Sequence, residues 1–136
     1  MADLDAIKFN PPASKEAIEY SSINLGIKFP EDLVVFYKKS NGGEGSLGEK
    51  GYIQLWRVED LAKFNADLNT QESLPNTFLF ASNGGGTNYG YRYKDGEGCY
   101  FSVDPISMQE DCFYGGKTLN ELLDKVSCGT FERMEF

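Results

Sequence analysis

The alternation of hydrophobic and polar residues is most regular in the middle of the chain, over residues 78–103. An apolar run at 78–81 ends at a serine, an asparagine and three glycines, and two alternating runs follow with Asp95 and Gly96 between them. A period of two residues is typical of β-strands whose two faces differ in polarity. The pattern therefore predicts three consecutive antiparallel strands.

The turn between the second and third of these strands decides which side chains share a face. A two-residue loop would place Tyr91 opposite Tyr100, and each face would then mix apolar with polar side chains. A loop with an odd number of residues would instead gather one apolar set, which is Tyr89, Tyr91, Tyr93, Cys99, Phe101 and Val103. We predict the odd loop, with a glycine bulge, and it leaves Arg92 and Tyr100 on the opposite face.

Four other segments have apolar residues at helical spacing, and they are residues 14–26, 30–39, 58–68 and 118–128. Ile18, Ile23 and Leu25 are the expected apolar anchors of the first of these helices. Pro30 suits the start of the second helix, because proline is favoured in the first turn. Thr118 opens a capping-box signature for the last helix.

Two glycine-rich stretches follow the second helix and the first central strand. We interpret the first as a helix exit that needs positive φ and the second as a tight connection between strands. The second stretch lacks the spacing of a nucleotide-binding loop, and a strand follows it where such a loop would precede a helix. The positions given a structural role are Asn41, Gly42, Gly43, Gly84, Gly85 and Gly86, together with Pro30.

These elements predict an α+β fold, with a twisted, mainly antiparallel sheet and helices packed on one of its faces. We expect loops at 44–50 and 69–76 and short strands at 51–56 and 112–114. Residues 1–136 are expected to form one domain, with an extended lead-in over 1–13 and a tail over 129–136. The end of the tail, 131–136, is expected to be either a final strand or a loose segment.

The composition argues against several kinds of catalytic and metal site. The chain has no histidine, which excludes Ser-His-Asp and Cys-His catalysis and removes the commonest zinc ligand. Its three cysteines form no C-x-x-C pair, so neither a disulfide framework nor a zinc site is indicated. No spacing singles out two carboxylates as an acid and base pair. We therefore expect no enzymatic activity, no metal and no cofactor.

The chain carries 21 acidic and 13 basic residues, a formal charge of −8. This charge repels nucleic-acid phosphates and attracts a basic protein partner, although it would equally serve solubility alone. No apolar run approaches the length of a membrane span, and the first residues lack the pattern of a secretory signal. We expect a cytoplasmic protein that binds neither nucleic acid directly nor a membrane.

Acidic residues gather around the second and third turns of the predicted strand region. Exposed turns are where contacts with a partner vary without disturbing a core. The candidate partner-binding residues are Asp95, Glu97, Asp104, Glu110 and Asp111, with Arg92 and Tyr100 on the adjoining non-core face. For each charged residue alone, a solvating role is an equally good interpretation.

Three blocks of the sequence resemble the SUKH superfamily. The first is the run 25–32, Leu-Gly-Ile-Lys-Phe-Pro-Glu-Asp, with Phe36 and the Asn-Gly-Gly at 41–43. The second, 80–86 followed by Tyr-Gly-Tyr at 89–91, is similar to that family's central glycine-rich hairpin. The helix at 118–126 resembles its closing helix, so the likeness runs over about residues 14–127.

This resemblance implies an α+β fold and binding by protein surfaces. The family includes bacterial immunity proteins that neutralise toxins, many of them nucleases, and a cell-wall assembly regulator of yeast, and it implies no shared catalytic residues. Arg92 stands where many relatives carry an acidic residue, which favours a partner-specific surface. The leading hypothesis is an immunity protein that binds a basic toxin domain. An adaptor or regulatory module is the alternative. The third hypothesis is an enzyme or small-ligand receptor that uses the glycine loop and the carboxylates.

Overall fold

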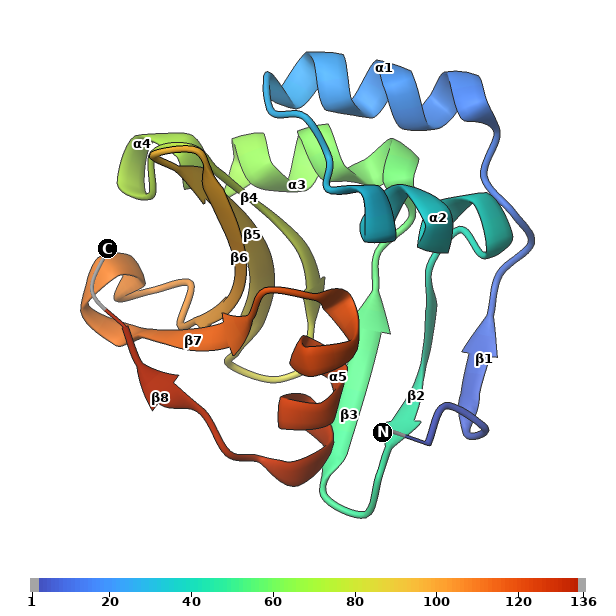
Figure 1. Cartoon of the computed structure of the whole chain (residues 1–136), viewed down its shortest axis with the longest axis vertical. Helices are drawn as coiled ribbons and strands as arrows, with labels where there is room; N and C mark the ends of the chain where they lie inside the picture. The colour runs from blue at the N-terminus through green and yellow to red at the C-terminus, as the bar shows by residue number, and fades with distance from the viewer. Residues whose placement is uncertain (1–2, 135–136) are drawn as a thin grey trace.

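The computed structural model describes residues 3–134, which form an antiparallel sheet of eight strands with five α-helices (Figure 1). The strands lie across the sheet in chain order. They are β1 (Ile7–Phe9), β2 (Gly43–Leu47), β3 (Gly51–Leu55), β4 (Thr77–Ser82), β5 (Asn88–Lys94), β6 (Glu97–Val103), β7 (Cys112–Gly116) and β8 (Glu132–Arg133). The predicted α+β fold is confirmed.

All four predicted helical segments are helical. The α-helices are α1 (Lys15–Leu25), α2 (Glu31–Lys39), α3 (Leu61–Asp67), α4 (Thr70–Ser73) and α5 (Leu119–Cys128), and short 3₁₀ helices cover Val58–Asp60 and Met108–Asp111. The Ser14 side chain accepts a hydrogen bond from the first turn of α1, and Thr118 does the same for α5. Gly26 and Gly129 end these two helices in the left-handed conformation.

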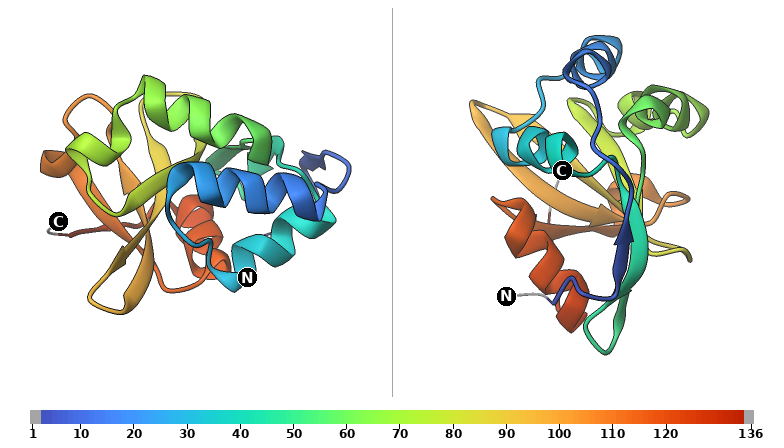
Figure 2. Two further views of the ribbon diagram at one scale, coloured as in Figure 1. Left: turned by 90° about the horizontal axis from the view of Figure 1, so that it is seen from above. Right: turned by 90° about the vertical axis from the view of Figure 1, so that its right-hand side faces the viewer.

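The main core lies between the sheet and helices α1, α2 and α5. In the right-hand view of Figure 2, α2 and α5 lie on the same side of the sheet, and α3 runs along the far side of its upper end. The largest side chains enclosed here include Leu33, Tyr37, Ile53, Phe78, Phe80, Tyr100 and Leu122. Burying such apolar and aromatic side chains is the dominant favourable contribution to folding.

The predicted odd loop between β5 and β6 is wrong. Tyr91 lies opposite Tyr100, and Asp95 and Gly96 form a two-residue turn with positive φ at both positions. The prediction failed because it assumed that only one face of these strands is buried. A second apolar cluster covers the other face, and its members are Leu74, Leu79, Phe101, Val103, Met108 and Cys112.

Other local predictions also need correction. The segment expected to be a loop at 44–50 contains most of β2, and α4 occupies part of the loop expected at 69–76. Ile23, an expected anchor of α1, is 77 % exposed. Strand β1 lies within the predicted extended lead-in, and β8 lies within the tail, where a final strand was one of the two expectations. The terminal residues 1–2 and 135–136 lie outside the described part.

Asn41 does not adopt the positive φ that a helix exit was expected to need. Only the next residue, Gly42, does, with φ 83°. The Asn41 amide instead joins two segments: its Oδ1 accepts from the Val58 backbone N–H at 2.8 Å, and its Nδ2 donates to Glu59 at 2.7 Å. A Cβ on Gly42 would lie 2.3 Å from the Leu55 carbonyl oxygen, so glycine is required there.

Candidate partner-binding surface

The connection between β6 and β7 is tied together by its own polar groups. The Asp104 carboxylate accepts a hydrogen bond from the Ile106 N–H at 2.8 Å, and the Asp104 carbonyl accepts one from the Met108 N–H at 2.8 Å. Ser107 Oγ donates to Asp111 Oδ2 at 2.6 Å. The Met108 side chain is buried in the second cluster. The carboxylates of Asp104 and Asp111 are therefore held in defined positions before any partner arrives.

Asp111 is the most strongly engaged acid of the connection. The hydrogen bond from Ser107 and the neighbouring Arg133 guanidinium hold the pKa of Asp111 below its usual range. Arg133, in β8, has its Nη2 3.3 Å from Asp111 Oδ1 and also donates to the Glu110 carbonyl. Its guanidinium lies 5.3 Å from the centre of the Phe113 ring.

A cleft of about 660 Å³ opens beside this connection. Its lining combines aromatic rings with charged groups: Tyr52, Tyr89, Phe113 and Phe131, with Asp104, Asp111 and Lys50. The Tyr89 and Phe131 rings stack with their centres 6.3 Å apart. Burial raises the pKa of Tyr89 to about 12, so this hydroxyl stays neutral well into the alkaline range. Carboxylates beside aromatic faces are suited to bind a cationic group.

The acidic residues predicted as contacts fall into two groups. Asp104, Glu110 and Asp111 lie on the connection between β6 and β7, whereas Asp95 and Glu97 lie at the exposed tip of the β5–β6 hairpin. Six residues of β6, 98–103, separate Glu97 from Asp104, which is about 20 Å at the usual rise of a strand. A small partner patch would meet one group or the other.

Tyr100 does not lie on a non-core face, and that prediction is wrong. Its side chain is fully buried in the main core, and its hydroxyl donates to Asp32 at 2.6 Å. Burial, together with the hydrogen bond to Asp32, raises the pKa of Tyr100. Arg92 lies on the face of the sheet opposite to Tyr91 and Tyr100, half-buried beside Cys99. Burial raises the pKa of Cys99, and the charge and hydrogen bond of Arg92 partly offset this rise.

One polar cluster was missed by the sequence reasoning. Tyr52 and Gln54, both on β3, donate to the Glu44 carboxylate on β2, and Ser82 Oγ donates to Gln54 at 3.0 Å. The hydrogen bond from Tyr52 is the main cause of the lowered pKa of Glu44. The pairing of Glu44 with Gln54 across the strands brings these groups together. A strand prediction for 43–47 would have revealed it.

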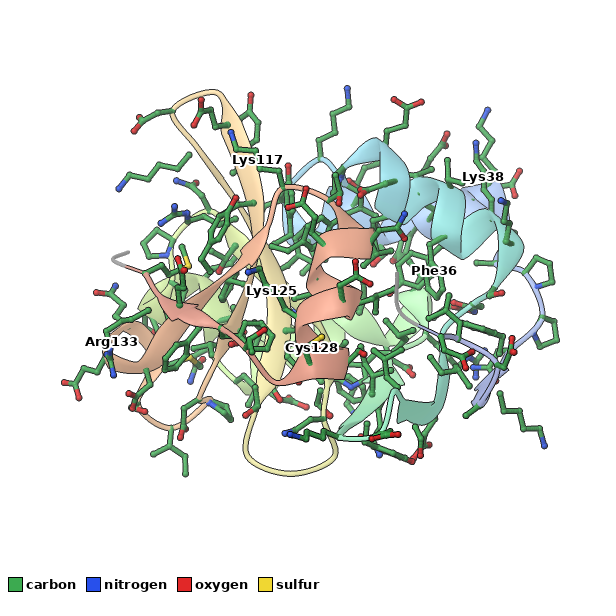
Figure 3. All side chains as sticks on the ribbon, turned by 60° about the horizontal axis from the view of Figure 1, so that its bottom comes forward. Phe36, Lys38, Lys117, Lys125, Cys128 and Arg133 are labelled. Carbon is green, nitrogen blue, oxygen red and sulfur yellow. The ribbon has the colours of Figure 1, made fainter. Side chains whose placement is uncertain are left out.

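An apolar groove of about 760 Å³ runs between β1, α2 and α5. Leu4, Phe9, Val35 and Phe36 contribute partly exposed apolar side chains to it. In Figure 3, Phe36 and Arg133 lie at opposite sides of the view, consistent with the groove and the acidic connection being separate surfaces. The groove was missed because it depends on β1, which the sequence did not predict.

Among residues 3–134 there is no helix long and apolar enough to cross a membrane. The same residues contain no group of three or more cysteine, aspartate or glutamate side chains placed to hold a metal ion.

The model of the SMI1/KNR4 family (SUKH-1) matches residues 12–125, most of the chain. The chain belongs to the SMI1/KNR4 family. The matched region of this SUKH-1 protein runs from just before α1 into α5 and includes all the acidic candidate residues, whereas β8 and Arg133 lie beyond it. A search among curated proteins found no significant match.

Proposed function

We propose that this SUKH-1 protein is an immunity-type protein that neutralises a bacterial toxin, of the basic nuclease class, by binding it in a one-to-one complex. The cleft beside the β6–β7 connection is the observation that supports the proposal. Asp104 and Asp111 are fixed at its edge, with the rings of Tyr89 and Phe131 beside them. Such a surface favours the lysine and arginine side chains that a nuclease uses to hold nucleic acid.

The proposal requires binding and no turnover. The chain lacks histidine, and the carboxylates at the cleft serve the local structure: Asp104 holds the Ile106 N–H, and Asp111 accepts from Ser107. Neither carboxylate has the neighbouring groups that a nucleophile and its activating base would need. One molecule of the protein would therefore block one molecule of toxin.

Charge complementarity supports the class of partner. The formal charge of −8 gives the protein a field that draws a basic domain toward it and repels the nucleic acid with which it would compete. Association should therefore be fast and should slow as salt is added. We place this function in the cytoplasm, where the substrates of a nuclease toxin lie.

The proposal predicts a toxin domain encoded beside the gene of this protein, and the experiment pairs the two. The purified domain cleaves a defined RNA or DNA substrate, and increasing amounts of the SUKH-1 protein are added. We expect cleavage to fall linearly and to stop at one equivalent, with a one-to-one complex in light scattering. Full cleavage in the presence of excess protein, with no complex formed, would reject the proposal.

The apolar groove between β1, α2 and α5 favours a second candidate function, that of an adaptor or regulatory module. Exposed apolar patches of this kind often mark protein interaction sites. Under this alternative the stable partner is a protein of the same cell, and replacing Val35 and Phe36 by polar residues abolishes that complex. Toxin neutralisation that survives the same replacements would separate the two functions.

A further inference from the structure

The side chain of Arg133 fills a small surface site, the corner, which is formed by the Asp111 carboxylate, the Glu110 carbonyl and the Phe113 ring. Its guanidinium lies 3.3 Å from the Asp111 carboxylate, donates to the Glu110 carbonyl and stands 5.3 Å from the centre of the Phe113 ring. A carboxylate, a carbonyl and an aromatic face satisfy the planar, five-donor guanidinium in three different ways. The corner is thus complementary to an arginine, beyond simple attraction of a positive charge.

A second arginine in a surface ion pair provides a matched comparison for this arrangement. Arg57 lies 3.3 Å from Glu59, and its side chain is 59 % exposed, against 62 % for Arg133. Within this pair, Arg57 donates to the Glu59 carboxylate. The pair includes neither a backbone carbonyl nor an aromatic ring of the kind found in the corner. Distance and exposure are therefore matched, and the two sites differ in the additional acceptor and the aromatic face.

Arg133 is also placed so that it could be exchanged. It belongs to β8, a strand of only two residues at the edge of the sheet. The backbone on either side is held by other side chains, because Phe131 stacks on Tyr89 and Met134 packs on the second cluster. The exposed Arg133 side chain can therefore leave the corner while the strand and the core keep their positions.

The corner adjoins the cleft described above. Asp111 and Phe113 belong to the lining of both, so a side chain that enters the cleft reaches two of the three groups that Arg133 contacts. We propose that the corner is a receptor for an arginine side chain of the basic partner, and that Arg133 occupies it until the partner's guanidinium takes its place. This inference rests on the proposed function for the identity of the partner, and it adds that an arginine is the anchor.

The test uses the full chain and a blocked pentapeptide, Thr-Arg-Val-Arg-Thr, as the probe. Binding is followed by NMR chemical-shift changes of the backbone N–H groups around the corner, with the same peptide carrying lysine or glutamine in place of arginine. We expect shifts centred on residues 110–113 with the arginine peptide, weaker binding of the lysine peptide, and none of the glutamine peptide. Equal affinity for the arginine and lysine peptides would overturn a guanidinium receptor.

Two matched variants distinguish competition between Arg133 and the peptide from a general effect of net charge on binding. Arg133→Gln and Arg57→Gln each remove one positive charge from an exposed ion pair. We expect Arg133→Gln to tighten binding of the arginine peptide about two- to five-fold relative to Arg57→Gln, since exposed pairs are worth that much. Asp111→Asn should abolish the shifts. The proposal fails if Arg133→Gln weakens binding, or if the two arginine variants behave alike.

The result does not depend on the toxin. A protein that neutralises a toxin but fails the peptide test retains the proposed function and loses this arginine site. Specific arginine binding at residues 110–113 without toxin neutralisation would keep the site and reject the nuclease partner.

Discussion

Tyr100 donates a 2.6 Å hydrogen bond to Asp32, a residue 68 positions earlier in the chain. The other oxygen of the same carboxylate accepts the Leu119 N–H at 2.7 Å, at the first residue of α5. One side chain in the first turn of α2 thus joins the middle of the sheet to the start of the last helix. The carboxylate also stabilises the positive end of the α5 dipole.

Asp32→Ala should therefore destabilise the fold more than an ordinary surface change. It leaves the buried Tyr100 hydroxyl without its acceptor and removes a charged cap from α5, and hydrogen bonds to charged groups are among the stronger ones. We expect a loss of about 2–4 kcal/mol in the free energy of unfolding, measured by urea denaturation.

Glu31→Ala is the matched control, because the neighbouring acid in the same turn of α2 is exposed. It should change stability by less than about 0.5 kcal/mol. A double-mutant cycle of Asp32→Ala with Tyr100→Phe then measures the coupling between these two side chains. Strictly additive losses of stability from the two substitutions would contradict the linkage.

Gly98→Ala tests the close packing of β5 and β6. A Cβ at position 98 would lie 1.6 Å from the Tyr91 hydroxyl oxygen and 2.4 Å from the ring carbon that bears it. Because Tyr91 is buried and its ring is rigid, the ring must move, and we expect a loss of about 1–3 kcal/mol. Gly86→Ala meets no atom within 4 Å and serves as the control. Equal melting temperatures for the two variants would show that Tyr91 moves freely.

The parts of the fold that follow from local signals were predictable from the sequence. Helix α5 has its capping threonine and its apolar spacing within ten residues, and the structure confirms both. Strand β2 was missed because its sequence, Gly-Glu-Gly-Ser-Leu, has little strand propensity. Its neighbours explain it: a Cβ on Gly45 would lie 2.3 Å from the Ala6 carbonyl oxygen, so glycine lets β1 approach.

The candidate site was predictable only as a set of charges along the chain. Reasoning from spacing found Asp104 and Asp111 but could not tell that they lie beside a cleft while Asp95 lies at the other end of β6. It also missed the contact of Asp32 with Tyr100, because nothing local points to a partner 68 residues away. Arg133 carried no signal, since its contacts depend on the pairing of β8 with β7.

Because several of its tyrosines are buried, the protein should lose stability at alkaline pH. Burial raises the pKa of Tyr89 to about 12, from about 10 in an unfolded chain. The neutral hydroxyl therefore stabilises the fold fully below about pH 10, and this contribution is lost as the pH rises through about 12. Urea unfolding between about pH 9 and 11 should show falling stability.

Tyr89→Phe is the control for this dependence, because phenylalanine does not ionise. The variant should lose less stability over the same range, while the raised pKa values of Tyr91 and Tyr100 preserve part of the slope. An unchanged slope would mean that Tyr89 ionises without cost in the folded protein.

The last prediction concerns which acidic group meets the partner. Asp104→Asn with Asp111→Asn, and Asp95→Asn with Glu97→Gln, each remove two negative charges from the formal −8. Asparagine at 104 keeps an oxygen that can accept from the Ile106 N–H, so the β6–β7 connection should retain its shape. Equal net charge makes the general slowing of association the same for both variants.

We therefore expect both double variants to associate more slowly with the toxin domain, as added salt also would produce. Only the variant at Asp104 and Asp111 should also dissociate faster, because these carboxylates lie at the cleft where contacts with the partner form, whereas the hairpin tip is exposed. Surface plasmon resonance at low and high salt measures both rates. Faster dissociation of the Asp95 and Glu97 variant alone would place the binding face on the β5–β6 hairpin, about 20 Å away along β6.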